Sequence, residues 1–220
     1  MKALVVIAHP DDHVLWINGT ISRFRNWEWH ILSLCNSHND KFQPKLETFN
    51  KSCDNLGAKK YQARRLKDYQ TKGLMEIEQP SKMQKEILAF ADKEYDLIFT
   101  HSVDPNCEYG FHANHSEVRD SVVGLIDEKL LKTKAVLYFC YKAQGQKKPV
   151  IANLGGADYK IELNREEAKK KKQLKQFFTW AEGDLKGLAL WDNEEPKIEA
   201  FNIRYFSKIE LPEGFIKCKN

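Results

Sequence analysis

The sequence predicts an α/β fold in which a mostly parallel sheet lies between layers of helices. Short β-branched or aromatic runs alternate with longer segments whose apolar residues recur at helical spacing, as in successive strand and helix units. The 220 residues contain no internal repeat, low-complexity tract or obvious linker. We therefore expect residues 1–220 to form a single domain around one core.

Strands and helices alternate regularly in the first half of the chain. The expected elements are a buried strand 4–8, a helix 14–25, a strand 29–34, a helix 45–56, a weak third strand from 59–61, a helix 81–94 and a strand 96–100. Gly57 ends the second helix, because a helix commonly closes on a residue in the left-handed conformation.

The second half follows a looser pattern after an irregular loop at 102–110. The expected elements are a helix 114–131, a strand 135–141, a short strand 159–163, a helix 165–182 and an aromatic segment 200–206. We expect the aromatic segment to pack onto an edge of the sheet. The four lysines 169–172 would fan around most of a helix, so we interpret them as solvated surface rather than a basic binding patch.

Composition excludes several classes of partner. Lys and Arg number 35 against 31 Asp and Glu, and the resulting charge of +4 is too small to hold a nucleic-acid backbone. No apolar run approaches the roughly 20 residues of a membrane span, and the run 3–8 is too short for a signal peptide. The five cysteines form no CxxC pair, so we expect small buried thiols in a cytoplasmic protein.

The segment after the first strand, residues 8–12, carries the most chemical information. It reads Ala-His-Pro-Asp-Asp, and it falls at the carboxyl edge of the sheet, where open α/β folds gather ligands. His9 and one aspartate could bind zinc, while the other aspartate could take a proton from water. A helix cap formed by Asp11 and Asp12 is the alternative interpretation.

A second polar cluster follows the strand 96–100 and therefore reaches the same edge. It begins with His101 and ends with the segment 109–115, which reads Tyr-Gly-Phe-His-Ala-Asn-His. Two histidines three residues apart at the opening of a helix lie on neighbouring faces, so one can ligate a metal while the other faces the substrate. The second cluster can therefore supply a third metal ligand to the site formed by residues 8–12.

These motifs resemble the PIG-L/LmbE family of zinc-dependent de-N-acetylases, whose hallmarks are Ala-His-Pro-Asp-Asp-Glu after the first strand and a distal His-x-x-His. Weaker matches follow in the right order: Asn18-Gly19-Thr20, Leu56-Gly57, the strand 96–100 with His101, and Glu199-Ala-Phe. The resemblance implies a Rossmann-like three-layer sandwich. It also implies that zinc, or another divalent metal, is bound by His9, Asp12 and His115.

The resemblance also implies catalytic roles, and this sequence differs from the family pattern at three positions. Asp11 would be the general base, His112 the proton donor or electrostatic partner, and Tyr109 the group that polarises the substrate carbonyl, although Phe111 lengthens that motif by one residue. His13 stands in place of the usual glutamate, Lys45 in place of a substrate-binding arginine, and Thr48 in place of an acidic residue. We expect an altered pocket in which Lys45, His101 and His13 contact substrate. For His101 two alternatives stay open, which are support of a metal ligand and a plain strand-terminal histidine.

The implied function is a hydrolase that removes an N-acetyl group from an N-acetylglucosamine-containing or related small substrate and releases acetate and a free amine. Besides a nucleic-acid binder that would use the lysine run 169–172 with Phe177, Phe178 and Trp180, two alternatives stay open. One is an N-acyl amide hydrolase with a different substrate on the same scaffold. The other is a non-catalytic sugar- or nucleotide-binding module, against which stands the lack of a GxGxxG motif after the first strand. The expected partner is an N-acetylated sugar or glycoconjugate, and assembly as a homo-oligomer stays open.

Overall fold

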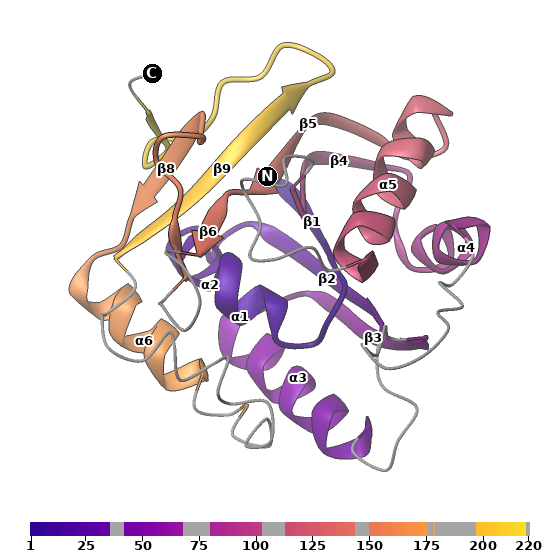
Figure 1. Ribbon diagram of the computed structural model, residues 1–220, viewed down its shortest axis with the longest axis horizontal. Helices are drawn as coiled ribbons and strands as arrows, with labels where there is room; N and C mark the ends of the chain where they lie inside the picture. The colour runs from indigo at the N-terminus through magenta and orange to yellow at the C-terminus, as the bar shows by residue number, and fades with distance from the viewer. Residues whose placement is uncertain are drawn as a thin grey trace.

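A computed structural model describes residues 1–35, 42–67, 80–102, 113–143, 150–175, 178 and 197–218. Within these residues one sheet of eight strands runs through the molecule (Figure 1). Its strands are Lys2–Ile7 (β1), Glu28–Cys35 (β2), Lys60–Leu66 (β3), Glu94–Thr100 (β4), Lys132–Phe139 (β5), Tyr159–Glu162 (β8), Ile198–Tyr205 (β9) and Ile216–Lys217 (β10). A separate pair contains Tyr141–Ala143 (β6) and Val150–Ala152 (β7).

The order in the sheet is β10-β8-β9-β5-β4-β1-β2-β3, and β1 to β5 pair in parallel. The predicted mostly parallel sheet is therefore confirmed. The aromatic segment 200–206 lies in β9, which pairs antiparallel with both β5 and β8, so its predicted place at an edge is wrong. The edge strand on that side is β10, because the chain continues past β9 and adds one more strand.

Helices cover both faces of the sheet and give three layers (Figure 1). They are Asp12–Trp16 (α1), Asn18–Arg23 (α2), Phe42–Leu56 (α3), Pro80–Phe90 (α4), Ala113–Asp127 (α5) and Arg165–Lys175 (α6). Alternate residues of β1 enter different cores, since Val5 packs with α1, α2, α3 and α6 while Val6 packs with α4 and α5. Both faces of a parallel sheet are thus buried, as its continuous apolar strands predict.

The helix predicted over 14–25 is two short helices, α1 and α2, which meet at Ile17 with φ −139°. The break is stabilised from far along the chain. The Glu199 carboxylate accepts the backbone N–H of Gly19 at 2.8 Å and that of Thr20 at 2.7 Å, which satisfies the new helix start. The Tyr141 hydroxyl donates to the Trp16 carbonyl at 2.8 Å at the end of α1.

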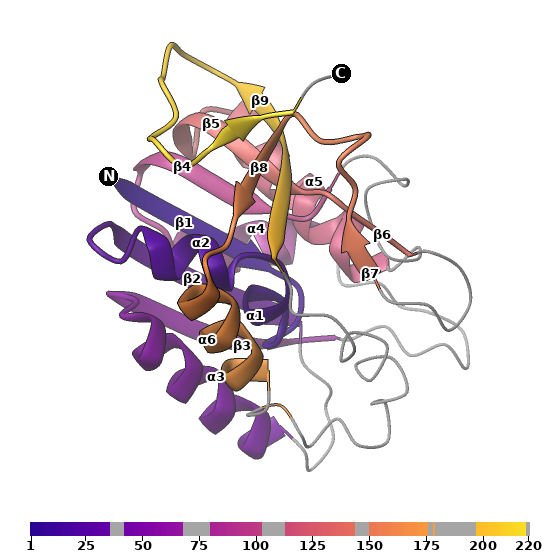
Figure 2. The ribbon, with the colours of Figure 1, turned by 90° about the vertical axis from the view of Figure 1, so that its left-hand side faces the viewer.

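The interpretation of the lysine run 169–172 as solvated surface is wrong for Lys171, which pairs with Glu199. Lys171 is only 2% exposed, and its ammonium donates to the buried Glu199 carboxylate. Figure 2 shows α6 beside α2, the arrangement that brings this lysine inward. Lys169 and Lys172 are exposed as predicted.

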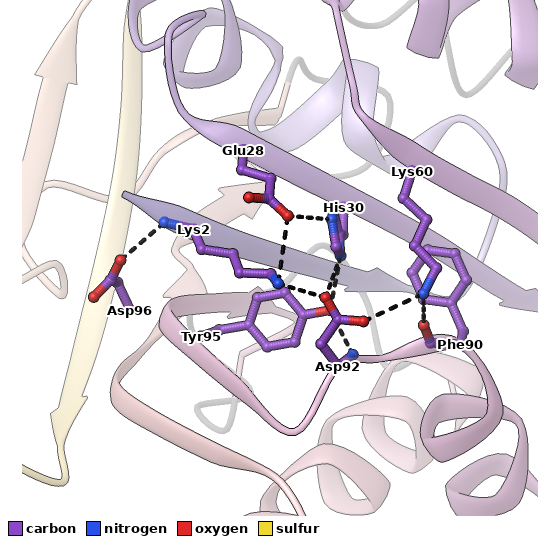
Figure 3. Close-up of polar contacts among 8 residues, drawn as sticks. All are labelled: Lys2, Glu28, His30, Lys60, Phe90, Asp92, Tyr95 and Asp96. Atoms are coloured by element: carbon purple, nitrogen blue, oxygen red, sulfur yellow. Dashed lines mark hydrogen bonds and ion pairs between the residues drawn. The ribbon is translucent and has the colours of Figure 1, made fainter.

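At the amino edge of the parallel strands, charged side chains form an ion-pair network (Figure 3). The Lys2 ammonium contacts Glu28 at 3.3 Å and also Asp92, while Lys60 lies 3.5 Å from Asp92. His30 fills the centre of this network, with its Nε2 3.0 Å from Glu28 Oε1. The network connects the starts of β1, β2 and β3 with the α4–β4 turn.

Three cysteines of the described residues, Cys35, Cys53 and Cys140, are buried thiols, as predicted, while Cys218 is partly exposed. Cys107 lies outside the described residues. In the same part of the chain, no helix is both long enough and apolar enough to cross a membrane.

Candidate metal centre

The carboxyl ends of β1 and β4 bring the two predicted clusters together. The strands are parallel neighbours, so His9 after β1 and His101 after β4 reach the same edge of the sheet. Asp12 opens α1, and His115 lies in the first turn of α5. Two segments about a hundred residues apart therefore meet without any local signal that joins them.

Three side chains converge at distances that suit one metal ion. Asp12 Oδ2 lies 3.6 Å from His9 Nδ1 and 3.7 Å from His115 Nε2, and the two histidine nitrogens are 3.2 Å apart. Tetrahedral ligands at about 2.0–2.2 Å from zinc are separated from one another by about 3.4 Å. The donor set, two imidazoles and one carboxylate, is one that zinc uses in catalytic sites. The residues present fit a divalent metal.

Asp12 is held in place by donors around its carboxylate. Oδ2 accepts the His9 backbone N–H at 2.7 Å, and Oδ1 accepts the Trp16 indole N–H at 3.2 Å. Burial alone would raise the pKa of Asp12, but the imidazoles of His115, His101 and His9 hold it well below its usual range. The side chain is thus kept as the carboxylate that a metal requires.

Asp11 has the opposite electrostatic character. Burial and the neighbouring Asp12 charge raise the pKa of Asp11 to about 6, against the opposing effects of His9 and Lys45. Lys45, the predicted substrate residue on α3, is thus close enough for its charge to lower the pKa of Asp11. No side-chain hydrogen bond from Asp11 caps α1, so the helix-cap alternative lacks its expected contact.

His13 does not join the group. It is fully buried, its Nε2 lies 2.6 Å from the Ser52 hydroxyl, and its ring meets Phe49 edge-on. Since the Ser52 hydroxyl donates to the Phe49 carbonyl at 2.8 Å, the imidazole N–H is the donor to Ser52. Burial lowers the pKa of His13 to about 3, so the ring is neutral. In this position it links α1 to α3.

The remaining predicted residues have different outcomes. Tyr109 and His112 lie outside the described residues. His101 is 1% exposed, and its Nε2 lies 3.3 Å from Asp12 Oδ2. The sequence interpretation overlooked Trp16, whose indole binds Asp12. Its spacing of four residues from Asp12 on a helix could have revealed the contact.

Comparison with known families shows the family of this chain. Residues 4–126, more than half of the chain, match the family described as GlcNAc-PI de-N-acetylase (PIG-L). The chain belongs to the PIG-L family. PIG-L membership supports a deacetylase-type hydrolase, in agreement with the motifs at residues 9–12 and 115. A search of curated proteins found no match.

Solved structures share the PIG-L chain's fold at low identity. A deacetylase of teicoplanin biosynthesis has 13% identity and a TM-score of 0.63, covering 93% of this chain and 98% of that one. The N,N'-diacetylchitobiose deacetylase of Pyrococcus horikoshii has 14% identity and a TM-score of 0.60, with 93% and 84% covered. The hydratase GalB of Pseudomonas putida has 13% identity and a TM-score of 0.56, with 96% and 99% covered. The fold alone therefore does not select the reaction.

Proposed function

We propose that this PIG-L family protein is a metal-dependent deacetylase that removes the acetyl group from an N-acetylated amino sugar, such as an N-acetylglucosamine-containing compound. The convergence of His9, Asp12 and His115 at metal-ligand separations carries the proposal. Family membership supports the reaction class. The side chain of His9 is 17% exposed, so the group borders solvent on that side.

The roles of His9, Asp12, His115 and Asp11 in this proposal agree with their positions and charges, and the roles of His112 and Tyr109 rest on the family resemblance alone. His9, Asp12 and His115 would hold the metal, which when bound lowers the pKa of water toward about 7 and polarises a carbonyl. Asp11 accepts a proton from the water that adds to the amide carbon. The bond between carbon and nitrogen then breaks, His112 protonates the leaving amine, and acetate and a free amine result. Tyr109 polarises the carbonyl in the same proposal.

Lys45 supports a polar substrate. Its charge acts on Asp11, so its ammonium belongs to the same electrostatic environment as the general base. An ammonium is a compact point charge, and it would bind a sugar hydroxyl or an anionic group without the bidentate geometry of an arginine. We therefore propose a substrate bound near Lys45 by single polar contacts. The N,N'-diacetylchitobiose deacetylase and the deacetylase of teicoplanin biosynthesis supply the analogy for an N-acetylated substrate.

Acetate release tests the proposal directly. The zinc-loaded full chain is incubated with N-acetylglucosamine, N,N'-diacetylchitobiose, GlcNAc-phosphatidylinositol and simple N-acetyl alkylamines. We expect acetate and free amine in equal amounts from the sugar substrates, and loss of this activity after chelation with recovery on zinc addition. Turnover of the alkylamines alone would favour the alternative amide hydrolase. Binding of the sugars without acetate release would instead favour the non-catalytic module.

A further inference from the structure

His101 lies among the three predicted metal ligands at the carboxyl edge of the sheet. It follows β4 directly, yet it is 1% exposed and offers almost no surface to a substrate. It contacts four segments: the end of β1, the start of α1 through Asp12 Oδ2 at 3.3 Å, the start of α5 and the end of β5. Three of these segments carry predicted metal ligands, which are His9, Asp12 and His115.

The contact with β1 is a backbone hydrogen bond. His101 Nε2 accepts the Ala8 N–H at 2.9 Å, while the next N–H along the chain, that of His9, is accepted by Asp12 Oδ2 at 2.7 Å. Two consecutive N–H groups of the turn are thus bound by two different side chains. Because a backbone N–H cannot rotate, this pair of bonds restricts the conformation from which the His9 side chain projects.

The contact with α5 is a flat stack. The rings of His101 and His115 lie 3.8 Å apart between centroids and are tilted by only 11°. Phe139 at the end of β5 meets His101 edge-on, at 5.6 Å and 89°. His101 therefore packs against both Phe139 and His115. The flat stack limits the orientation of the His115 ring.

We propose that His101 is a positioning residue that holds His9 and His115 at metal-binding separation before a metal arrives. Nε2 of His101 is not available as a metal ligand, because its lone pair accepts the Ala8 N–H at 2.9 Å. The inference deepens the proposed function and rests on it only in that the group binds a metal. Restriction of ligand orientation by a neighbouring side chain is a general means of increasing metal affinity.

Two variants separate the two contacts. His101→Gln keeps an acceptor near the position of Nε2 but loses the flat ring, and His101→Phe keeps the ring but loses the acceptor. The matched control is His30→Gln, since His30 is also a buried histidine of the sheet but lies at the opposite edge. The readouts are the zinc dissociation constant, from competition with a chromophoric chelator, and the visible spectrum of the cobalt-substituted protein. Thermal unfolding of each metal-free variant monitors the fold.

We expect both His101 variants to bind zinc about 10–100-fold more weakly than the unmodified chain, as loss of an outer-shell partner does. We also expect altered cobalt bands, which a purely structural residue would leave unchanged. The His30→Gln control should keep the affinity and the spectrum. Zinc affinity within about threefold in both His101 variants, where a 10–100-fold loss is expected, would overturn the inference but not the proposed function. Absence of zinc binding by the unmodified chain would overturn both.

Discussion

The two edges of the sheet each hold a cluster of histidine and carboxylate side chains. At the carboxyl edge His9, Asp12 and His115 have ligand atoms within 4.8 Å of one another, and at the amino edge Glu28, His30 and Asp92 satisfy the same condition. Proximity of histidines and carboxylates therefore does not distinguish a metal site from a structural one.

Charge balance makes the distinction. At the amino edge, the Lys2 ammonium contacts both carboxylates, and Lys60 adds a second cation, so the position of a metal is taken by protein cations (Figure 3). At the carboxyl edge, the Asp12 carboxylate faces imidazoles, which are neutral or positive according to pH and can give a lone pair to a metal. The comparison teaches that the group that balances the charge of a carboxylate distinguishes a metal site from a structural ion pair better than the types of the neighbouring residues do.

The largest expected difference between the edges is in metal binding. His115→Ala removes one of the three proposed direct ligands, so zinc affinity should fall by more than the roughly 10–100-fold cost of losing an outer-shell partner. His30→Ala, at the amino edge, should leave one zinc bound per chain. Metal content after dialysis and chelator competition measure both. Full zinc occupancy of the His115→Ala protein would refute the ligand assignment.

Catalysis should also be confined to one edge. Asp11→Asn removes the proposed proton acceptor while leaving the three ligands, so kcat for acetate release should fall by about 10²–10⁴-fold with zinc retained. Asp92→Asn is the matched control, and its kcat should equal that of the unmodified protein. The assignment of Asp11 as the base fails if Asp11→Asn turns over at the normal rate.

The sequence was sufficient for the parallel sheet and for the segments that lie at its edge. Apolar runs ending in polar residues located β1 and β4, and the rule that parallel strands end together placed His9, Asp12 and His115 near one another. These inferences succeed because each depends on short segments and one topological rule. The exact distances among the ligands came only from the structure.

The failures arise where distant residues decide a local conformation. The helix predicted over 14–25 breaks because Glu199, about 180 residues later, binds the N–H groups that begin α2. Lys171 is buried beside the same carboxylate, although Lys169 and Lys172 of the same run are exposed. His13 follows Asp12 directly, but a helix turns each successive side chain by about 100°. His13 therefore points toward α3 rather than toward the metal ligands.

A smaller effect concerns the pH dependence of stability at the amino edge. Burial lowers the pKa of His30, although the Asp92 charge opposes this. The unfolded state, with a histidine pKa of about 6.5, then binds more protons than the folded state, so acidification below about pH 6.5 destabilises the fold. The groups that face His30 are Lys2 on β1, Glu28 on β2, Lys60 on β3, Asp92 before β4, and Tyr95 on β4.

Urea unfolding at pH 7.5, 6.5 and 5.5 measures this effect. The unmodified protein should lose more unfolding free energy on acidification than His30→Gln does, with a difference of at most about 1.4 kcal/mol per pH unit for one proton. Parallel pH profiles for the two proteins would show that His30 does not contribute. Other titrating groups are common to both proteins, so the difference between the profiles isolates this histidine.

The smallest expected effect tests the cation that distinguishes the two edges. Lys2→Met removes the ammonium that contacts Glu28 and Asp92, but all three side chains are between 30% and 49% exposed. Exposed ion pairs contribute about 0–1 kcal/mol, so the unfolding free energy should fall by no more than this. The backbone N–H of residue 2 can still donate to Asp96, as it does at 2.9 Å, so β1 keeps its register. The difference should shrink in about 1 M salt, where the screening length is about 3 Å. A loss that persists in high salt would indicate that Lys2 stabilises this edge by packing rather than by charge.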